Sequence, residues 1–139
     1  NVAGIKDATS EEFSPKSKHK VIHIMKEQIE KLHRAELGGS MRLGSYPCIL
    51  SDGSLAKKLY KKKNVSERHR HRYEFNNAYK KQLEKSGLVF SGISPDGKLV
   101  EMIEIPEHKF FIATQAHPEF KSRPDRPHPL FEGFIRSCF

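Results

Sequence analysis

The sequence has no tryptophan, only two cysteines and few long hydrophobic runs. None of these runs approaches the roughly 20 apolar residues that a membrane-spanning helix requires. Two cysteines are too few for the disulfide framework of a small secreted domain, and the first residues lack the pattern of a secretory signal. We therefore expect a soluble, cytoplasmic protein that contacts no membrane.

Acidic residues are scarce relative to basic ones: 17 Asp and Glu stand against 25 Lys and Arg, a formal net charge of +8. The excess is concentrated in "KKLYKKK" (57–63) and "ERHRHR" (67–72). Such a charge attracts phosphates or acidic partner surfaces. No zinc-finger spacing, arginine-glycine repeat or recognition helix accompanies it, so nucleic-acid binding is the weakest of our hypotheses.

The 139 residues suffice for one domain or part of one. Six runs have the pattern of strands: 20–25, 41–50, 67–75, 88–94, 98–106 and 109–115. We expect the last of these to be buried. Helices are expected in part of 26–36 and over 55–63, 76–87 and 128–139. Asp52 or Ser54 is a candidate cap for the helix at 55–63, and Pro95-Asp96-Gly97 predicts a hairpin. This alternation predicts an α/β fold with some antiparallel pairing.

The stretch "ATQAHPEFKSRP" (113–124) places His117 two residues before Glu119, at the exit of a predicted strand. Ligands of open α/β sheets bind at such strand ends. A glutamate that accepts from one ring nitrogen of a histidine leaves the other free to activate a thiol or hydroxyl. The alternative is a surface loop whose imidazole has no catalytic role.

Neither cysteine has the sequence context of a nucleophile. A nucleophilic elbow needs small neighbours, usually glycines, whereas Cys48 lies in "YPCIL" and Cys138 in "RSCF". We interpret both as packing residues.

Two further motifs have structural alternatives. In "ERHRHRYE" strand geometry would put Arg68, Arg70 and Arg72 on one face, and His69 and His71 on the other. The arginines would bind a carboxylate or phosphate, or would only keep an edge strand soluble. No third ligand supports zinc at the two histidines, and no metal site is expected. "GGSMRLG" (38–44) is either a weak phosphate cradle or, more simply, a turn.

Taken in order, six stretches resemble the C-terminal glutaminase domain of the CTP synthase family, a class I glutamine amidotransferase domain joined to an ATP-dependent synthetase domain. They are "NVAG…DA…EF", "GGSMRLG", "ERHRHRYEFNN", "GL…SG…LVE.IE", "ATQAHPEFKSRP" and "HPLF.GF". The resemblance implies a partial three-layer αβα amidotransferase fold. It also implies hydrolysis of L-glutamine to glutamate and ammonia, which aminates UTP to CTP in pyrimidine nucleotide biosynthesis.

By this resemblance His117 and Glu119 match two members of a Cys-His-Glu triad. Arg72 matches the residue that holds the glutamine substrate, and Glu12 an acidic residue at its α-amino end. The family further implies ATP and Mg²⁺ in the synthetase domain, GTP as activator and a homotetramer, with no cofactor bound by these 139 residues themselves.

The chain departs from the family pattern in two places. Ala116 replaces a usually aromatic residue. The family's cysteine precedes the segment that matches Asn1, so residues 1–139 correspond to the later part of the domain, and "NVAG" to the end of the helix after the nucleophile. The missing cysteine leaves open an inactive amidotransferase-like regulatory or scaffold domain.

Overall fold

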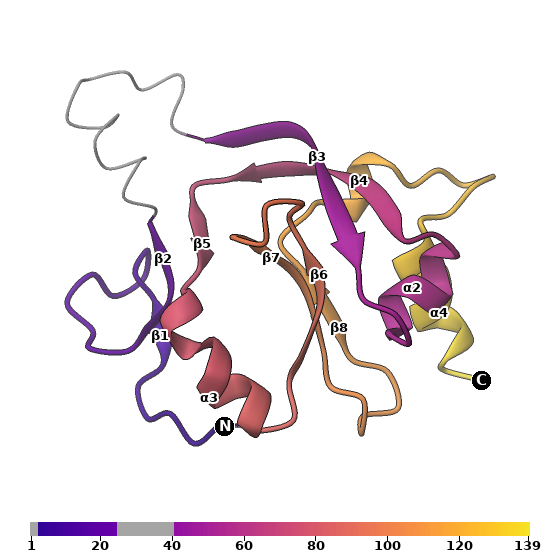
Figure 1. Ribbon diagram of the computed structural model, residues 1–139. Coiled ribbons are helices and arrows are strands. Elements are labelled where there is room, and N and C mark those ends of the chain that lie inside the picture. The colour runs from indigo at the N-terminus through magenta and orange to yellow at the C-terminus, as the bar shows by residue number, and fades with distance from the viewer. Residues whose placement is uncertain (1–2, 25–40) are drawn as a thin grey trace.

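The computed structural model describes residues 3–24 and 41–139 (Figure 1). The strands are β1 (Thr9–Ser10), β2 (Lys20–Ile24), β3 (Arg42–Leu50), β4 (Asn64–His71), β5 (Tyr73–Phe75), β6 (Val89–Ile93), β7 (Val100–Glu104) and β8 (Ile112–Thr114). The helices are α2 (Leu55–Tyr60), α3 (Lys80–Lys85) and α4 (Pro129–Arg136), with 3₁₀ turns η1 (Asn77–Tyr79) and η2 (Pro118–Phe120). The expected helix within 26–36, the glycines at 38–39 and the first two residues lie outside the described ranges.

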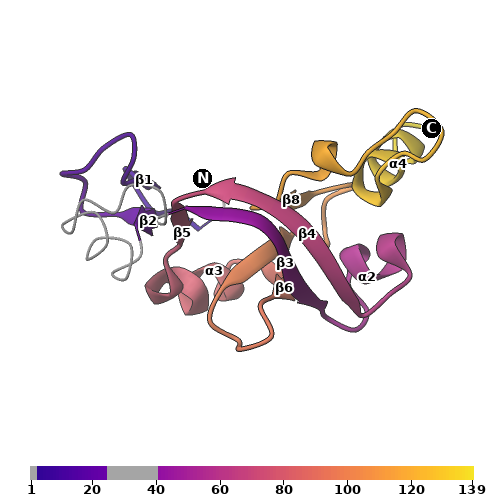
Figure 2. The same ribbon diagram turned by 90° about the horizontal axis from the view of Figure 1, so that it is seen from above.

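The strands form two sheets. The larger has the order β4-β3-β6-β7-β8 with every neighbouring pair antiparallel. The smaller has the order β1-β2-β5, in which β1 pairs with β2 in parallel and β5 with β2 antiparallel. Two views show the small sheet at one end of the molecule and helices α2 and α4 at the other, with the β3–β4 ladder running between them (Figures 1 and 2).

Local signals placed several element ends correctly. Asn76 caps the turn before α3 through its side chain, and Gly87 beyond this helix has φ +87°. Strands β6 and β7 form the predicted hairpin around residues 94–99. Ser54, and not Asp52, caps α2 by accepting from the Lys57 backbone N–H, and the helix stops earlier than expected because Lys61 adopts φ +55°.

Two predicted strands differ in the structure. The run 67–75 is two strands, β4 and β5, which belong to different sheets and meet at Arg72. The run 109–115 contains only the three-residue β8. Its residues Ile112 and Thr114 are half-buried and Ala113 is exposed, so the strand is not buried as predicted. The split depends on where the chain leaves one sheet for another, and the exposure of β8 on its position at the edge of the large sheet, and a local sequence pattern shows neither.

The hydrophobic core is small and divided. One cluster contains Cys48, Leu50, Ala56 and Met102, and the other Leu88, Phe90 and Val100. No helix among the described residues is long and apolar enough to cross a membrane.

Candidate active site

His117 and Glu119 form a hydrogen-bonded pair at the end of β8. The His117 Nδ1 lies 2.7 Å from the Glu119 Oε1, and both side chains are partly open to solvent. The hydrogen bond from His117 lowers the pKa of the Glu119 carboxyl, so the glutamate is ionised at neutral pH. Because the carboxylate accepts a hydrogen bond from Nδ1, the other ring nitrogen, Nε2, is available to take up or donate a proton.

The loop that carries this pair is fixed at both ends. The His117 backbone N–H donates to the Arg68 carbonyl on β4 at 2.8 Å, and the Phe120 ring stacks on the imidazole at 5.1 Å between centroids. Pro118 begins the short η2 turn that brings Glu119 back towards the histidine. These contacts hold the imidazole in one orientation without burying it.

Glu12 and Arg72 line one surface hollow of about 450 Å³, although 60 residues separate them in sequence. Its other lining residues are Ile22, Met41, Arg70, His71, Tyr73 and Gln115. Among the described residues the Arg72 guanidinium has no ion-pair partner within 4 Å, nor has the Glu12 carboxylate. A cation and an anion facing one hollow suit a zwitterionic ligand such as an amino acid.

The neighbouring Glu11 is occupied elsewhere. Its carboxylate accepts from the Lys20 ammonium at 2.6 Å and from the Ile24 backbone N–H at 2.9 Å, and the hydrogen bond from Lys20 lowers the pKa of Glu11. Of the two adjacent glutamates, only Glu12 lines the hollow. The structure thus separates a residue that stabilises the small sheet from one that faces the hollow.

The pair and the hollow are adjacent but distinct. His117 and Glu119 do not line the hollow, whereas Gln115, two residues before the histidine, does. Burial is the main cause of the lowered pKa of His69 and His71, and the proximity of His117 is a smaller one for both; His71 is itself a lining residue of the hollow. The structure thus brings Glu12 and Arg72 to one hollow and His117 and Glu119 into one pair beside β4, and the individual roles of the four stay predictions.

Neither cysteine thiol forms a hydrogen bond with His117 or Glu119. Cys48 is buried in the core, and burial raises the pKa of its thiol to about 12, so it is not a nucleophile. Cys138 is exposed after α4, which corrects its interpretation as a packing residue. Its thiol is only 3.5 Å from the Phe134 carbonyl of the same helix end, a local contact.

The predicted alternation of arginines and histidines holds along β4 as far as His71, but not for Arg72, which lies outside both strands. Arg68 and Arg70 are exposed, and His69 on the opposite face is buried. Strand β4 is an edge of the large sheet, as the alternative interpretation of its charge required. The His69 Nδ1 lies 2.7 Å from the His71 Nε2, and no group of three or more metal-ligating side chains occurs within the described ranges.

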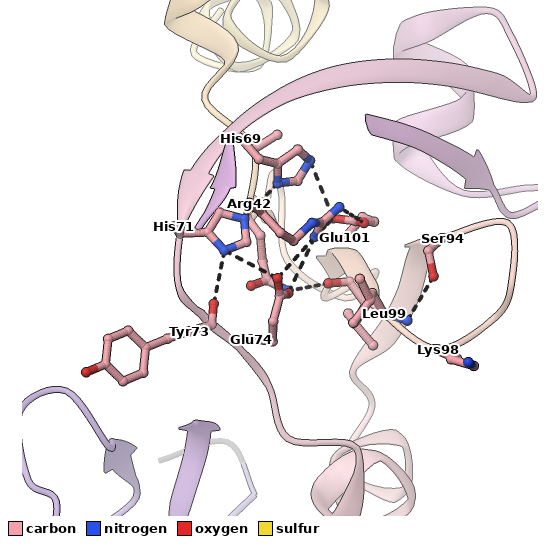
Figure 3. A network of polar contacts seen from close by, with 12 residues as sticks. Arg42, His69, His71, Tyr73, Glu74, Ser94, Lys98, Leu99 and Glu101 are labelled. Carbon is pink, nitrogen blue, oxygen red and sulfur yellow. Dashed lines mark hydrogen bonds and ion pairs between the residues drawn. The ribbon is translucent and has the colours of Figure 1, made fainter. Parts of the chain in front are cut away.

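Sequence reasoning missed a buried charged cluster beneath the histidines (Figure 3). Arg42 on β3 contacts the Glu101 carboxylate through both terminal nitrogens, at 2.7 and 3.2 Å, and the Glu74 carboxylate at 3.3 Å. Burial raises the pKa of Glu74 to about 7, against the opposing effect of Arg42. A signal was present, since Glu101 lies between the apolar residues Val100 and Met102, but a buried partner cannot be found from one sequence.

Comparison with known proteins then assigns the family. The model of the class I glutamine amidotransferases matches residues 11–137. The chain belongs to this family. This amidotransferase chain is 58% identical over 138 residues to a CTP synthase of Rubrobacter xylanophilus. It is 53% identical over 137 residues to a CTP synthase of Staphylococcus saprophyticus.

The amidotransferase fold is confirmed by a solved structure, the glutaminase domain of Trypanosoma brucei CTP synthase with bound acivicin. The two chains superpose with a TM-score of 0.86 at 40% identity, over 99% of this chain and 52% of the other. The chain spans about a quarter of the length of the curated relatives, 24% for the Rubrobacter protein and 25% for the Staphylococcus protein. The similarity therefore concerns the glutaminase part of these larger proteins.

Proposed function

We propose that this chain forms the later part of the glutaminase domain of a CTP synthase, which hydrolyses L-glutamine and passes the ammonia to UTP activated by ATP. The observation that carries the proposal is the 2.7 Å His117–Glu119 pair beside a hollow lined by Arg72 and Glu12. The high identity to CTP synthases over 99% of the chain supports the same assignment. UTP and ATP would bind the synthetase domain, outside these residues.

The proposed chemistry uses each residue in turn. Arg72 binds the α-carboxylate of glutamine and Glu12 its α-ammonium, which orients the side-chain amide. A thiol outside residues 1–139 loses its proton to the imidazole of His117 and attacks the carboxamide carbon. The imidazolium, stabilised by Glu119, then gives this proton to the departing ammonia, and water cleaves the resulting thioester to glutamate.

The test is His117→Ala in the intact protein that contains this chain. We expect glutamine-dependent CTP formation to fall by about 10³-fold or more, because the general base and acid is lost. CTP formation from added ammonia should stay within about twofold of the wild-type rate, because ammonia bypasses glutamine hydrolysis.

The matched control is His108→Ala, which removes an exposed histidine in the loop after β7. It should leave both reactions unchanged. Loss of both activities in His117→Ala, or full retention of the glutamine-dependent one, would contradict the proposed role.

A second candidate is a catalytically inactive regulatory or scaffold domain, favoured by the observation that Cys48 is buried with a raised thiol pKa and that the only hydrogen-bond contact of the Cys138 thiol among the described residues is the Phe134 carbonyl. The residues that precede Asn1 in the intact protein distinguish the two. A G-x-C-x-G elbow there supports the enzyme, and its absence supports the scaffold.

A further inference from the structure

Arg72 occupies a one-residue junction between two sheets. Strand β4 ends at His71 in the large sheet and β5 begins at Tyr73 in the small one. The direction of the Arg72 side chain is therefore set by a bend in the backbone and not by the regular alternation of a strand. A residue that fixes this bend also fixes where the guanidinium points.

The His71 imidazole bridges the bend. Its Nδ1 lies 3.0 Å from the Tyr73 carbonyl oxygen on the far side of Arg72 (Figure 3). Burial and the nearby Arg42 charge lower the pKa of His71 to about 4, so the ring is neutral at pH 7. A carbonyl can only accept, so the single ring proton is on Nδ1 and Nε2 is an acceptor.

His69 completes the bridge from inside the sheet. Its Nδ1 lies 2.7 Å from the His71 Nε2 and must be the donor, because the His71 nitrogen carries no proton. Burial lowers the pKa of His69 to about 3, and its side chain is only 1% exposed. A rigid, buried ring on β4 therefore holds the His71 ring in one orientation.

The other side of the bend is anchored to the same cluster. Glu74, directly after Tyr73, is held by Arg42 at 3.3 Å, and Arg42 is fixed in turn by Glu101 on β7 at 2.7 Å. Both arms of the junction are thus attached to central strands of the large sheet, while Arg72 itself has no polar partner among the described residues and lines the hollow with Glu12.

We propose that His71 is a positioning residue for substrate recognition: its hydrogen bond to the Tyr73 carbonyl fixes the β4–β5 bend and so directs Arg72 towards the α-carboxylate of an amino-acid substrate. The inference rests on the proposed function, which supplies glutamine as that substrate. His71 acts on binding through Arg72 and takes no part in the reaction.

The experiment compares two amide variants in the intact protein, His71→Asn and His71→Gln, by glutamine-dependent and ammonia-dependent CTP formation. The Asn amide nitrogen takes the place of Nδ1 and can donate to the Tyr73 carbonyl, whereas the Gln amide reaches the position of Nε2. We expect the KM for glutamine to stay within about threefold in His71→Asn and to rise about tenfold or more in His71→Gln. The ammonia-dependent rate should change less than about twofold in both, because that reaction does not use the glutamine hollow.

Coupling to Arg72 provides the decisive control. In an Arg72→Ala background, adding His71→Gln should change the KM for glutamine by less than about twofold, because the residue through which His71 acts is gone. Equal KM values for His71→Asn and His71→Gln, or a full additional effect in the Arg72→Ala background, would overturn the inference. If Arg72→Ala itself leaves the KM unchanged, the proposed substrate clamp fails first, so the two failures are distinguishable.

Discussion

At the scale of single residues, the site is a surface pair supported by buried polar groups. His117 and Glu119 are partly exposed, yet the imidazole is close enough to His69 and His71 to influence the pKa of each. Buried polar groups are stable only when their hydrogen bonds are satisfied, and these two histidines satisfy each other. Of the two, His69 lies inside the sheet, whereas His71 also lines the hollow beside Arg72.

The two buried histidines predict a pH-dependent stability. Their pKa values in the folded protein, about 3 and about 4, are below the ordinary 6.5, so between these limits the folded state binds fewer protons than the unfolded one. Their contribution is complete above pH 6.5 and is lost as the pH falls. Glu74 has the opposite effect on the unfolding free energy, because its pKa in the folded protein is raised from 4.5 to about 7 and the folded state therefore binds more protons there. Since two histidines oppose one glutamate, the net effect is a loss of stability as the pH falls.

We therefore expect the intact protein to lose about 1–2 kcal/mol of unfolding free energy between about pH 6.5 and pH 5, measured by thermal or urea unfolding. In His69→Gln only His71 and Glu74 remain, and their opposite effects nearly cancel. The loss of unfolding free energy between about pH 6.5 and pH 5 should therefore nearly vanish in this variant. His108→Gln, at an exposed histidine, should behave as the wild type. An identical loss in His69→Gln and the wild type would contradict the assignment.

At the scale of elements, β6 is packed closely between its two neighbouring strands at Gly92. A Cβ added at Gly92 would lie 2.9 Å from the Cys48 Sγ and 2.9 Å from the Met102 Cβ. The second contact is the more serious, because a Cβ is fixed by its backbone and cannot swing away. Gly92 is therefore required by close packing between β3 and β7, and not by a positive φ.

Gly92→Ala should destabilise the intact protein by about 1–3 kcal/mol through overpacking, measured by urea unfolding. Its neighbour provides the control: Ser91 is fully buried and its Oγ has no hydrogen-bond partner among the described residues. Ser91→Ala removes an unsatisfied hydroxyl and should be neutral or slightly stabilising. A tolerated Gly92→Ala, or a Ser91→Ala that destabilises as much, would show that the packing of β6 is described incorrectly.

At the scale of the whole molecule, the described residues bury little apolar surface. The two clusters contain four and three buried side chains, and large apolar side chains such as Phe131, Phe134 and Ile135 remain exposed on α4. The solved glutaminase-domain chain is about twice as long as the part that this chain matches, 52%. A core of this size gives only marginal stability by itself.

We expect the isolated 139 residues to unfold with a broad transition of low enthalpy, measured by calorimetry. Addition of a complementary fragment, equivalent to the part of the solved glutaminase domain that this chain does not cover, should give a sharper transition at higher temperature, because apolar surface becomes buried between the parts. A cooperative, high-enthalpy transition of the isolated chain would contradict this prediction.

The sequence by itself determined the features that depend on near neighbours. Asn76, Gly87, the hairpin at 94–99 and the alternation of β4 follow from capping, positive φ and the two-residue period of a strand. The His117–Glu119 pair belongs to the same class, because two residues in one short turn are close in any fold that keeps the turn. The family resemblance, which extends along the whole chain, supplied the roles.

Only the tertiary structure decided what depends on distant segments. It placed Glu12 and Arg72 at one hollow, excluded Glu11 from it, and split the run 67–75 between two sheets. It also paired Arg42 with Glu74 and Glu101, which are 32 and 59 residues away. Burial and charge pairing are properties of the folded environment, so no local pattern specifies which charged residue is enclosed and which faces a ligand.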